Sequence, residues 1–455
     1  MIKLKKFIYY LALIPLVVIL ALFGWFFAVM FEGENPGITL QPAPEFLTED
    51  QAFKLNISDR KRGLKDLKVS LEQEGRELTL FEEKFPFKGF LNRQGVHEFD
   101  KEFTVEPSAL KLAQGRVELR IRAWDYSRRH GGDGNLSITV HKMLVDTLPP
   151  SLRTVSRMHN INVGGSALVL YQTSSDAIQS GVYVGDLFFS GFPTQHRSEE
   201  GFHACYFALP HDSGANPSIS LWARDRAGNE SRTGFYCHVI NKRFRKDKIK
   251  LSESFLKRII QYFASTAAFP AGASDLEKYL YINNAVRKEN NLSFYRVGQK
   301  TSPLRLWDGP WMRLSNAATM ARFGDRRAYY FQGEMVDEQV HMGIDLASLA
   351  NSPVEAANTG RVVFADGLGI YGSTVVLDHG QGLASLYGHL SKIEVTSGQE
   401  VKKGDIIGYT GQTGLAGGDH LHFGIMVHGV FVNPIEWWDP HWIQDNVTRK
   451  LALLQ

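Results

Sequence analysis

Two short segments in the last third of the chain carry side chains that could bind a metal ion. In residues 340–346, the imidazole of His341 and the carboxylate of Asp345 alternate with apolar residues, and His420 and His422 do the same in residues 420–425. Alternation of period two predicts β-strands, in which every second side chain projects from one face. Three nitrogen and oxygen ligands from two such strands would hold zinc with its fourth position open to water, which is the catalytic arrangement.

A third segment, Ser385-Leu-Tyr-Gly-His389, has the same period, so Ser385, Tyr387 and His389 are predicted to share one face of a strand. Residues 367–372 fit the glycine pattern of dinucleotide-binding loops, but a strand and a turn follow them where such a site needs a helix. We therefore interpret these glycines as a loop between strands.

Together the three histidine segments resemble the lysostaphin/LytM-type zinc metalloendopeptidases, which cut peptide bonds in bacterial peptidoglycan. That family's pattern is HxxxD, then Tyr-x-His-Leu, then HxH followed by Phe. The chain reads His341-Met-Gly-Ile-Asp345, Tyr387-Gly-His-Leu390 and His420-Leu-His-Phe423. The similarity continues through shorter segments, such as Gly360-Arg-Val-Val363 and Val401-Lys-Lys-Gly404, and ends near Pro434.

The resemblance implies a role for each matched residue. His341, Asp345 and His422 become the zinc ligands, and His389 and His420 become the catalytic pair. His420 would deprotonate a zinc-activated water, and His389 would stabilise the oxyanion or orient the water. Because every ligand position is retained, the resemblance favours active peptidases over metal-free activator members of the group.

The elements that must position this site begin with a long apolar run. Residues 7–31 contain no charged residue and are long enough to cross the roughly 30 Å hydrocarbon layer, which predicts a transmembrane helix. Lys3, Lys5 and Lys6 precede it, so the N-terminus is predicted to be cytoplasmic and the bulk of the chain periplasmic, behind a single pass of the inner membrane. A cleaved signal peptide is the alternative.

Two β-rich segments follow the apolar run. Short alternating apolar stretches fill residues 52–145, and Asp146-Thr-Leu-Pro-Pro150 marks a boundary before the second segment. Ile121-Arg-Ala-Trp-Asp125 and Leu221-Trp-Ala-Arg-Asp225 echo each other. We interpret the echo as paired immunoglobulin-like modules, with a coincidental similarity of two hairpins as the alternative.

A basic stretch at 242–250 is interpreted as a solvated linker, and helical spacing from Ser252 onward predicts a small helical insert. The residues from 242 to 332 have no counterpart in the minimal catalytic domain that the chain resembles. They could cover the substrate groove and autoinhibit the enzyme, or they could simply pack as a spacer.

The expected fold is mainly β: an N-terminal transmembrane helix, two immunoglobulin-like β-sandwich modules, a small helical insert and a C-terminal antiparallel β-sheet domain of the LytM type. The predicted segments are 1–31 cytoplasmic tip and anchor, 32–51 spacer, 52–148 first β-sandwich module, 149–241 second β-sandwich module, 242–310 helical insert, 311–440 zinc peptidase domain and 441–455 C-terminal tail.

Composition adds limits rather than a function. The 455 residues allow about three domains, and a hydrophobic content of 44% is that of an ordinary globular protein. Because 51 basic residues stand against 48 acidic ones, charge gives no reason to expect a nucleic-acid partner. Cys205 and Cys237 could pair in an oxidising compartment or remain buried thiols.

The sequence therefore predicts a membrane-anchored zinc endopeptidase that hydrolyses peptide cross-links of peptidoglycan. Its expected partners are the peptidoglycan peptide stems, the inner membrane through the N-terminal helix, and other proteins through the β-sandwich modules. The alternative is a non-enzymatic envelope protein that binds cell wall or activates another cell-wall hydrolase.

Overall fold

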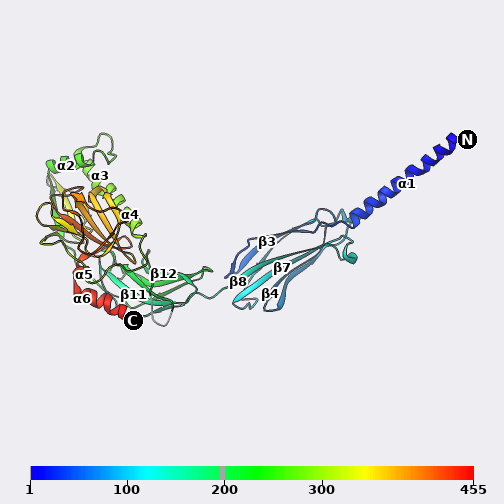
Figure 1. The fold of residues 1–455 in the computed structure, drawn as a ribbon, viewed down its shortest axis with the longest axis horizontal. Coiled ribbons are helices and arrows are strands. Elements are labelled where there is room, and N and C mark those ends of the chain that lie inside the picture. The colour runs from blue at the N-terminus through cyan, green and yellow to red at the C-terminus, as the bar shows by residue number, and fades with distance from the viewer. Residues whose placement is uncertain (1, 195–199, 215, 455) are drawn as a thin grey trace. The chain divides into compact units, whose positions relative to one another are not determined.

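The computed structural model describes residues 2–194, 200–214 and 216–454. The chain forms two compact units, the first made of Met1–Leu148 with Ala227–Asn229 and the second of Pro149–Arg226 with Glu230–Gln455. Strands dominate both units, as predicted (Figure 1). The finer division of the chain into seven segments stays a prediction.

The first element is the helix α1, Ile2–Met30. Its segment Tyr9–Met30 has 22 residues and a mean hydropathy of 2.7, so it is long and apolar enough to cross a membrane. A signal sequence near the N-terminus would meet the same description. The predicted helix is therefore confirmed, whereas its use as an anchor stays a prediction.

The rest of the first unit is built from two antiparallel sheets that share a core. One has the strand order β1-β3-β6 and the other the order β2-β8-β7-β4-β5, with β2 added in parallel. Alternate residues such as Leu55 and Ile121 are buried between the sheets, which is the period-two pattern of half-buried strands. The bounds are β1 Gly37–Gln41, β2 Phe46–Leu47, β3 Gln51–Ser58, β4 Leu64–Gln73, β5 Arg76–Lys84, β6 Glu98–Val105, β7 Gly115–Asp125 and β8 Leu136–Val145.

The second unit begins with two four-stranded sheets, in the orders β14-β15-β11-β9 and β13-β12-β16-β17, and a parallel pair of β10 with β18. Cys205 is buried on β15, and both it and Cys237 are free thiols. The bounds are β9 Leu152–Thr154, β10 Asn160–Asn162, β11 Ser166–Thr173, β12 Ala177–Val184, β13 Leu187–Ser190, β14 Phe192–Pro193, β15 Phe202–Ala208, β16 Ile219–Asp225, β17 Glu230–Gly234 and β18 His238–Ile240.

The predicted linker and helical insert form ordered structure. The prediction of a solvated linker is wrong for Lys246–Leu251, which forms the strand β19 and pairs in parallel with β21. Its apolar residues Ile249 and Leu251 pack on the core, so the segment is not free in solvent. The predicted helical spacing from Ser252 onward is confirmed. Ser252 is the N-cap of α2, and its hydroxyl accepts the Phe255 N–H. The bounds are α2 Glu253–Phe263, α3 Asp275–Tyr281, a π-helical turn Ile282–Val286 and α4 Arg287–Gly298.

An eight-stranded sheet organises the last part of the chain, in the order β20-β23-β31-β27-β26-β25-β29 with β32 on β31, beside a smaller sheet β24-β30-β28. The bounds are β20 Ala318–Ala321, β21 Arg326–Phe331, β22 Glu334–Val340, β23 Ile344–Ala347, β24 Pro353–Glu355, β25 Gly360–Gly367, β26 Ser373–Gly380, β27 Leu383–Leu390, β28 Lys392–Ile393, β29 Glu400–Val401, β30 Ile406–Tyr409, β31 Leu421–Val427 and β32 Val430–Val432. Helices α5 Pro434–Trp438, α6 Pro440–Ile443 and α7 Arg449–Leu451 follow.

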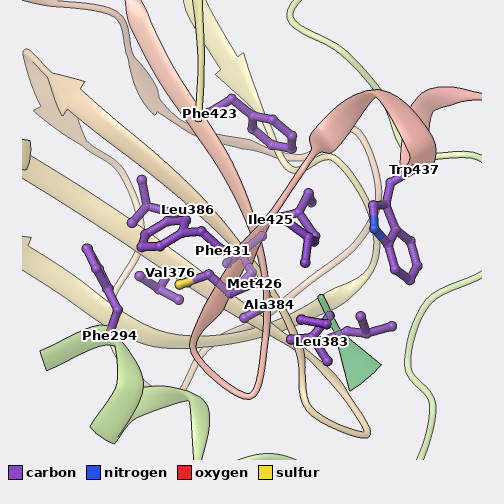
Figure 2. Packing of buried hydrophobic residues seen from close by; sticks show 14 of the residues in the cluster. Phe294, Val376, Leu383, Ala384, Leu386, Phe423, Ile425, Met426, Phe431 and Trp437 are labelled. Carbon is purple, nitrogen blue, oxygen red and sulfur yellow. The ribbon is translucent and has the colours of Figure 1, made fainter. Parts of the chain in front are cut away.

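The core of this sheet includes side chains from helices that precede the sheet in the sequence and from helices that follow it. Figure 2 shows Phe294 of α4 and Trp437 of α5 among the side chains of β26, β27 and β31. The rings of Phe294 and Phe431 lie 5.6 Å apart, and Trp437, which is fully buried, lies 5.3 Å from Trp311. The helical insert is thus continuous with the core of the sheet that carries the histidines.

Two sequence predictions about local structure fare differently. Residues 367–372 join the antiparallel strands β25 and β26 through a short 3-10 turn, which confirms the loop between strands. The predicted continuous strand through 340–346 is wrong, because β22 ends at Val340 and β23 begins at Ile344 in another sheet. Between them, His341 exchanges main-chain hydrogen bonds with Asp325 and Gly324 instead of with a neighbouring strand.

Candidate metal centre

Strand pairing places the first two candidate ligands side by side. Asp345 on β23 and His422 on β31 are direct partners in the antiparallel ladder, so their side chains leave the sheet on the same face. His341 reaches them from the link before β23. A Cβ on Gly343 would lie 2.6 Å from the His422 ring, so only glycine lets the link pass this close to the imidazole.

Three ligand atoms meet at this point, and we call His341, Asp345 and His422 the His–Asp–His group. His341 Nε2 lies 3.0 Å from His422 Nδ1, and Asp345 Oδ1 lies 2.9 Å from both nitrogens. All three residues are at least nine-tenths buried. The group has the composition and spacing to hold a metal ion.

The positions of the ring protons and lone pairs support a metal ion in this group. His341 Nδ1 lies 3.0 Å from the carbonyl oxygen of Arg322, which assigns the ring proton to Nδ1 and a lone pair to Nε2. That lone pair and the Asp345 carboxylate would repel each other unless a cation lay against both. His422 offers at most one proton to them, and its Nε2 is buried with no hydrogen-bond partner in the described part of the chain. The residues present therefore fit a bound cation.

Arg327 of β21 holds the other oxygen of Asp345. Its Nη2 donates to Asp345 Oδ2 at 2.9 Å, so Oδ1 is left to face the two imidazoles. Burial alone would raise the pKa of Asp345, but its electrostatic interactions with the three surrounding histidines, led by His341, bring it well below its ordinary value. Arg327 could not be identified from the sequence, because no motif links it to Asp345 and only the folded sheet brings the two together.

The two predicted catalytic histidines lie beside this group. Each has its Nδ1 tied to a carbonyl oxygen at 2.8 Å, His389 to Thr413 and His420 to Gly418, which leaves Nε2 of both rings with a lone pair. Their ring centroids are 4.8 Å apart, and His420 Nε2 lies 3.6 Å from Asp345 Oδ1. The structure thus brings all five predicted site residues together.

The two imidazoles differ in their electrostatic surroundings. Burial lowers the pKa of His389 well below its ordinary value, and the neighbouring histidines lower it further. Burial also acts to lower the pKa of His420, but the nearby carboxylate of Asp345 outweighs this and raises it. His389 is therefore neutral near pH 7, whereas His420 gains basicity from a carboxylate.

The prediction that Ser385, Tyr387 and His389 share one face is wrong. Tyr387 pairs with Phe423 and Gly388 with His422, so Tyr387 and Ser385 point away from the site. His389 returns to the site because its φ of 63° lies in the left-handed region, a conformation that a non-glycine residue adopts at an energetic cost. The Ser385 hydroxyl instead lies 2.9 Å from Tyr387 Oη, whose oxygen accepts the Ala357 N–H at 2.7 Å.

A cleft of about 470 Å³ opens above the His–Asp–His group and its two neighbouring histidines. One wall comes from residues that precede the eight-stranded sheet in the sequence, including Leu251, Phe255 and Tyr279. Three basic side chains, Lys250, Arg287 and Arg327, also line it. The helical insert therefore shapes the space in which a substrate would lie.

The chain matches known proteins through this part of its structure. Residues 339–434 match the family model "Peptidase family M23". The peptidoglycan DD-endopeptidase ShyA of Vibrio cholerae is 40% identical over 162 residues, which are 36% of this chain and 35% of that protein. The murein hydrolase activator EnvC of Escherichia coli is 35% identical over 119 residues, which are 26% of each chain.

The catalytic domain of lysostaphin from Staphylococcus simulans is a similar solved structure, with 30% identity, coverage of 29% of this chain and 98% of that chain, and a TM-score of 0.24. The matched segment spans only about a fifth to a third of the length of the curated relatives, 22% in the first and 35% in ShyA.

Proposed function

Because residues 339–434 make this chain a member of peptidase family M23, we propose that it is a zinc-dependent endopeptidase that hydrolyses peptide cross-links of bacterial peptidoglycan. The observation that carries the proposal is the buried His–Asp–His group at the floor of a cleft that also holds His389 and His420. The similarity to a protein named peptidoglycan DD-endopeptidase supports the substrate class.

His341, Asp345 and His422 would hold the zinc ion, which when bound polarises a carbonyl group and lowers the pKa of water. Two imidazoles and one carboxylate are a ligand set that leaves a position open for chemistry. Arg327 keeps Asp345 Oδ2 occupied, so that Oδ1 stays turned toward the nitrogens. Main-chain bonding of His341 Nδ1 to Arg322 fixes the orientation of that ring.

His420 acts as the general base. Its Nε2 lone pair faces the cleft, and Asp345 at 3.6 Å favours the imidazolium that forms when His420 takes a proton from the attacking water. His389 orients that water, because its neutral ring keeps its proton on Nδ1 and offers Nε2 as an acceptor. The same tautomer gives Nε2 of His389 no proton to donate to an oxyanion.

We place this activity outside the cytoplasm. The apolar helix α1 would anchor the chain in the inner membrane, with Lys3, Lys5 and Lys6 on the cytoplasmic side. The β-rich segments between α1 and the cleft would then be periplasmic spacers or binding platforms. N-terminal sequencing of the mature protein tests this, because a new N-terminus after α1 would mean a cleaved signal sequence.

The proposed reaction is tested by measuring bound zinc and the peptides released from purified peptidoglycan. Wild type should carry one equivalent of zinc and release peptides, and His422→Ala should lose both the zinc and the activity. Wild type that binds zinc while His422→Ala and His420→Ala digest peptidoglycan equally well would overturn the mechanism.

The second candidate function is activation of another cell-wall hydrolase, which the similarity to a protein named murein hydrolase activator favours. An activator needs no metal. If His422→Ala stimulates a separate hydrolase as well as wild type does, and wild type alone releases no peptides, the chain is an activator.

A further inference from the structure

Three carboxylates meet in the first unit, far along the sequence from the peptidase site. We call Glu32, Asp59 and Asp125 the three-carboxylate group. Their residues are only 7%, 2% and 0% exposed, and each offers an oxygen within 4.8 Å of the other two. Glu32 follows α1, Asp59 follows β3, and Asp125 ends β7, so three separate segments converge here.

One carboxylate oxygen in this group has no hydrogen-bond partner. Asp59 Oδ1 accepts the main-chain N–H groups of Lys61, Arg62 and Gly63 at 3.1, 2.7 and 2.6 Å. Asp59 Oδ2 is buried and has no partner among the described residues. A buried acceptor that is left unsatisfied costs free energy, and it costs more on a charged group.

The side-chain amide of Asn135 lies within hydrogen-bond distance of more oxygens than it has hydrogens to donate. Asn135 Nδ2 lies 3.0 Å from Glu32 Oε1 and 2.8 Å from Asp125 Oδ2, and it lies 3.1 and 3.3 Å from the carbonyl oxygens of Glu32 and Glu34. An amide group has two hydrogens for these four oxygens. Main-chain N–H groups of Glu34, Ser127 and Asn135 donate to the remaining oxygens of Glu32 and Asp125, so among the described residues the shortage of donors is confined to Asp59 Oδ2 and the shared Asn135 amide.

The two basic side chains near the group, Arg62 and Lys61, make their closest contacts with other oxygens. Arg62 is 1% exposed, but its Nε and Nη1 donate to the carbonyl oxygens of Tyr126 and Leu91, and no ion pair within 4.0 Å joins it to the three carboxylates in the described part of the chain. Lys61 Nζ is half exposed and lies 3.9 Å from Glu32 Oε2 but 3.0 Å from Glu34. The buried guanidinium of Arg62 is therefore close enough to interact electrostatically with the three carboxylates, but it makes no direct ion pair with them among the described residues.

We propose that Glu32, Asp59 and Asp125 bind a calcium ion. The ligands are all oxygen atoms. This argues against zinc, which prefers nitrogen and sulfur ligands, and favours a calcium or magnesium ion. Calcium accepts six to eight oxygens in flexible geometry, including main-chain carbonyls, whereas magnesium keeps several of its waters and suits a closed protein cage poorly.

The bound ion would fix the chain where it leaves α1. The carbonyl oxygen of Glu32 accepts the Ser127 hydroxyl at 2.8 Å, and the Arg128 N–H donates to the carbonyl oxygen of Met30 at 2.8 Å. Calcium adds a direct link from Glu32 to the loop after β3 and to the end of β7. The junction between α1 and the β-sheets is then rigid with calcium and looser without it.

The test is calorimetric titration of CaCl₂ into the full-length, zinc-loaded protein in detergent, with a thermal melt at each calcium level. Wild type should bind about one equivalent with a Kd of roughly 10⁻⁴ M. Its first unit should melt roughly 10 °C higher at a hundred times Kd. Asp59→Asn keeps the Oδ1 acceptor but loses the charge at Oδ2, so it should lose calcium binding. Asp50→Asn, the same change at an exposed site, should behave as wild type.

Glu32→Gln is the second variant, because Glu32 lies in the segment after α1 and its loss leaves the strands intact. It should weaken binding at least tenfold while circular dichroism stays unchanged. Folded wild type that gives no saturable heat with CaCl₂ would overturn the proposal. So would Asp59→Asn and Glu32→Gln that both titrate like wild type, or magnesium that binds as tightly as calcium.

Discussion

The His–Asp–His group and the three-carboxylate group are both buried, and both bring three ligand atoms within 4.8 Å of one another, but they offer different chemistry. Two imidazoles and a carboxylate suit zinc, whereas three carboxylates suit calcium. The first group lies under a cleft of about 470 Å³, and the second is enclosed by strands and by the segment after α1. Donor type and access together distinguish the proposed reaction site from the proposed structural site.

The largest expected effect comes from removing a ligand of the first group. His422→Ala leaves two ligands, so the protein should lose its zinc, and the metal's several kcal/mol of transition-state stabilisation correspond to roughly a thousandfold fall in kcat/KM. Metal analysis and peptide release measure the two effects. Calcium titration of the same variant should match wild type, and a loss of calcium binding would mean that the two groups are not independent.

A smaller effect is expected when the general base is removed but the ligands are kept. His420→Ala should retain zinc and lower kcat by ~10²–10⁴-fold, because proton transfer then depends on solvent. His441→Ala, at an exposed histidine outside the cleft, is the matched control. If His420→Ala lost zinc as His422→Ala does, His420 would be a ligand and the assignment of the first group would be wrong.

A still smaller effect is expected when Arg327, which binds the proposed ligand Asp345, is replaced. Arg327→Met frees Asp345 Oδ2 from its 2.9 Å ion pair, so Asp345 should hold its ligand position less firmly and the zinc affinity should fall by ~10–100-fold. Competition with a zinc chelator measures the affinity. Arg326→Met, an exposed neighbour on β21, should leave it unchanged, and an equal affinity in both variants would show that Arg327 does not position Asp345.

The two groups also differ in how far the sequence predicts them. The first is visible because its ligands lie in short motifs: His341 and Asp345 are four residues apart in one, and His422 follows His420 by two residues in the other. The second has its carboxylates at positions 32, 59 and 125, and no spacing rule connects them until β3 and β7 are folded. Local motifs reveal sites whose ligands share a strand or turn, and long-range sites appear only with the tertiary structure.

The same limit explains the errors in local structure. Period-two alternation predicted strands correctly through much of the chain, but it could not show that the strand breaks at His341 or that His389 has a positive φ. Both departures are set by neighbours distant in sequence: Asp325 and Gly324 take the main-chain bonds of His341, and Thr413 holds the His389 ring. These departures occur where the candidate site is built, because side-chain placement there outweighs regular backbone geometry.

The smallest effect expected for a single group is on stability and depends on pH. In the second unit, burial lowers the pKa of His159, His379 and His428 to about 4, far below the value of about 6.5 in an unfolded chain. Between these values the unfolded state binds protons that the folded state does not, so stability falls as the pH falls. From pH 7 to pH 5 each histidine should cost about 2 kcal/mol. Hydrogen exchange of core amides in this unit measures the loss.

The three-carboxylate group should respond to acid with the opposite sign when calcium is absent. Burial raises the folded-state pKa of both Glu32 and Asp59 above the ordinary carboxyl values, so the folded state binds more protons than the unfolded state in that window. Their contribution to stability is complete below the ordinary values and is lost as the pH rises through the folded pKa. Calcium should cancel this loss near pH 7, because it replaces the protons with a cation. The contrast between the units fails if, without calcium, Glu32→Gln leaves the pH dependence of exchange in the first unit unchanged.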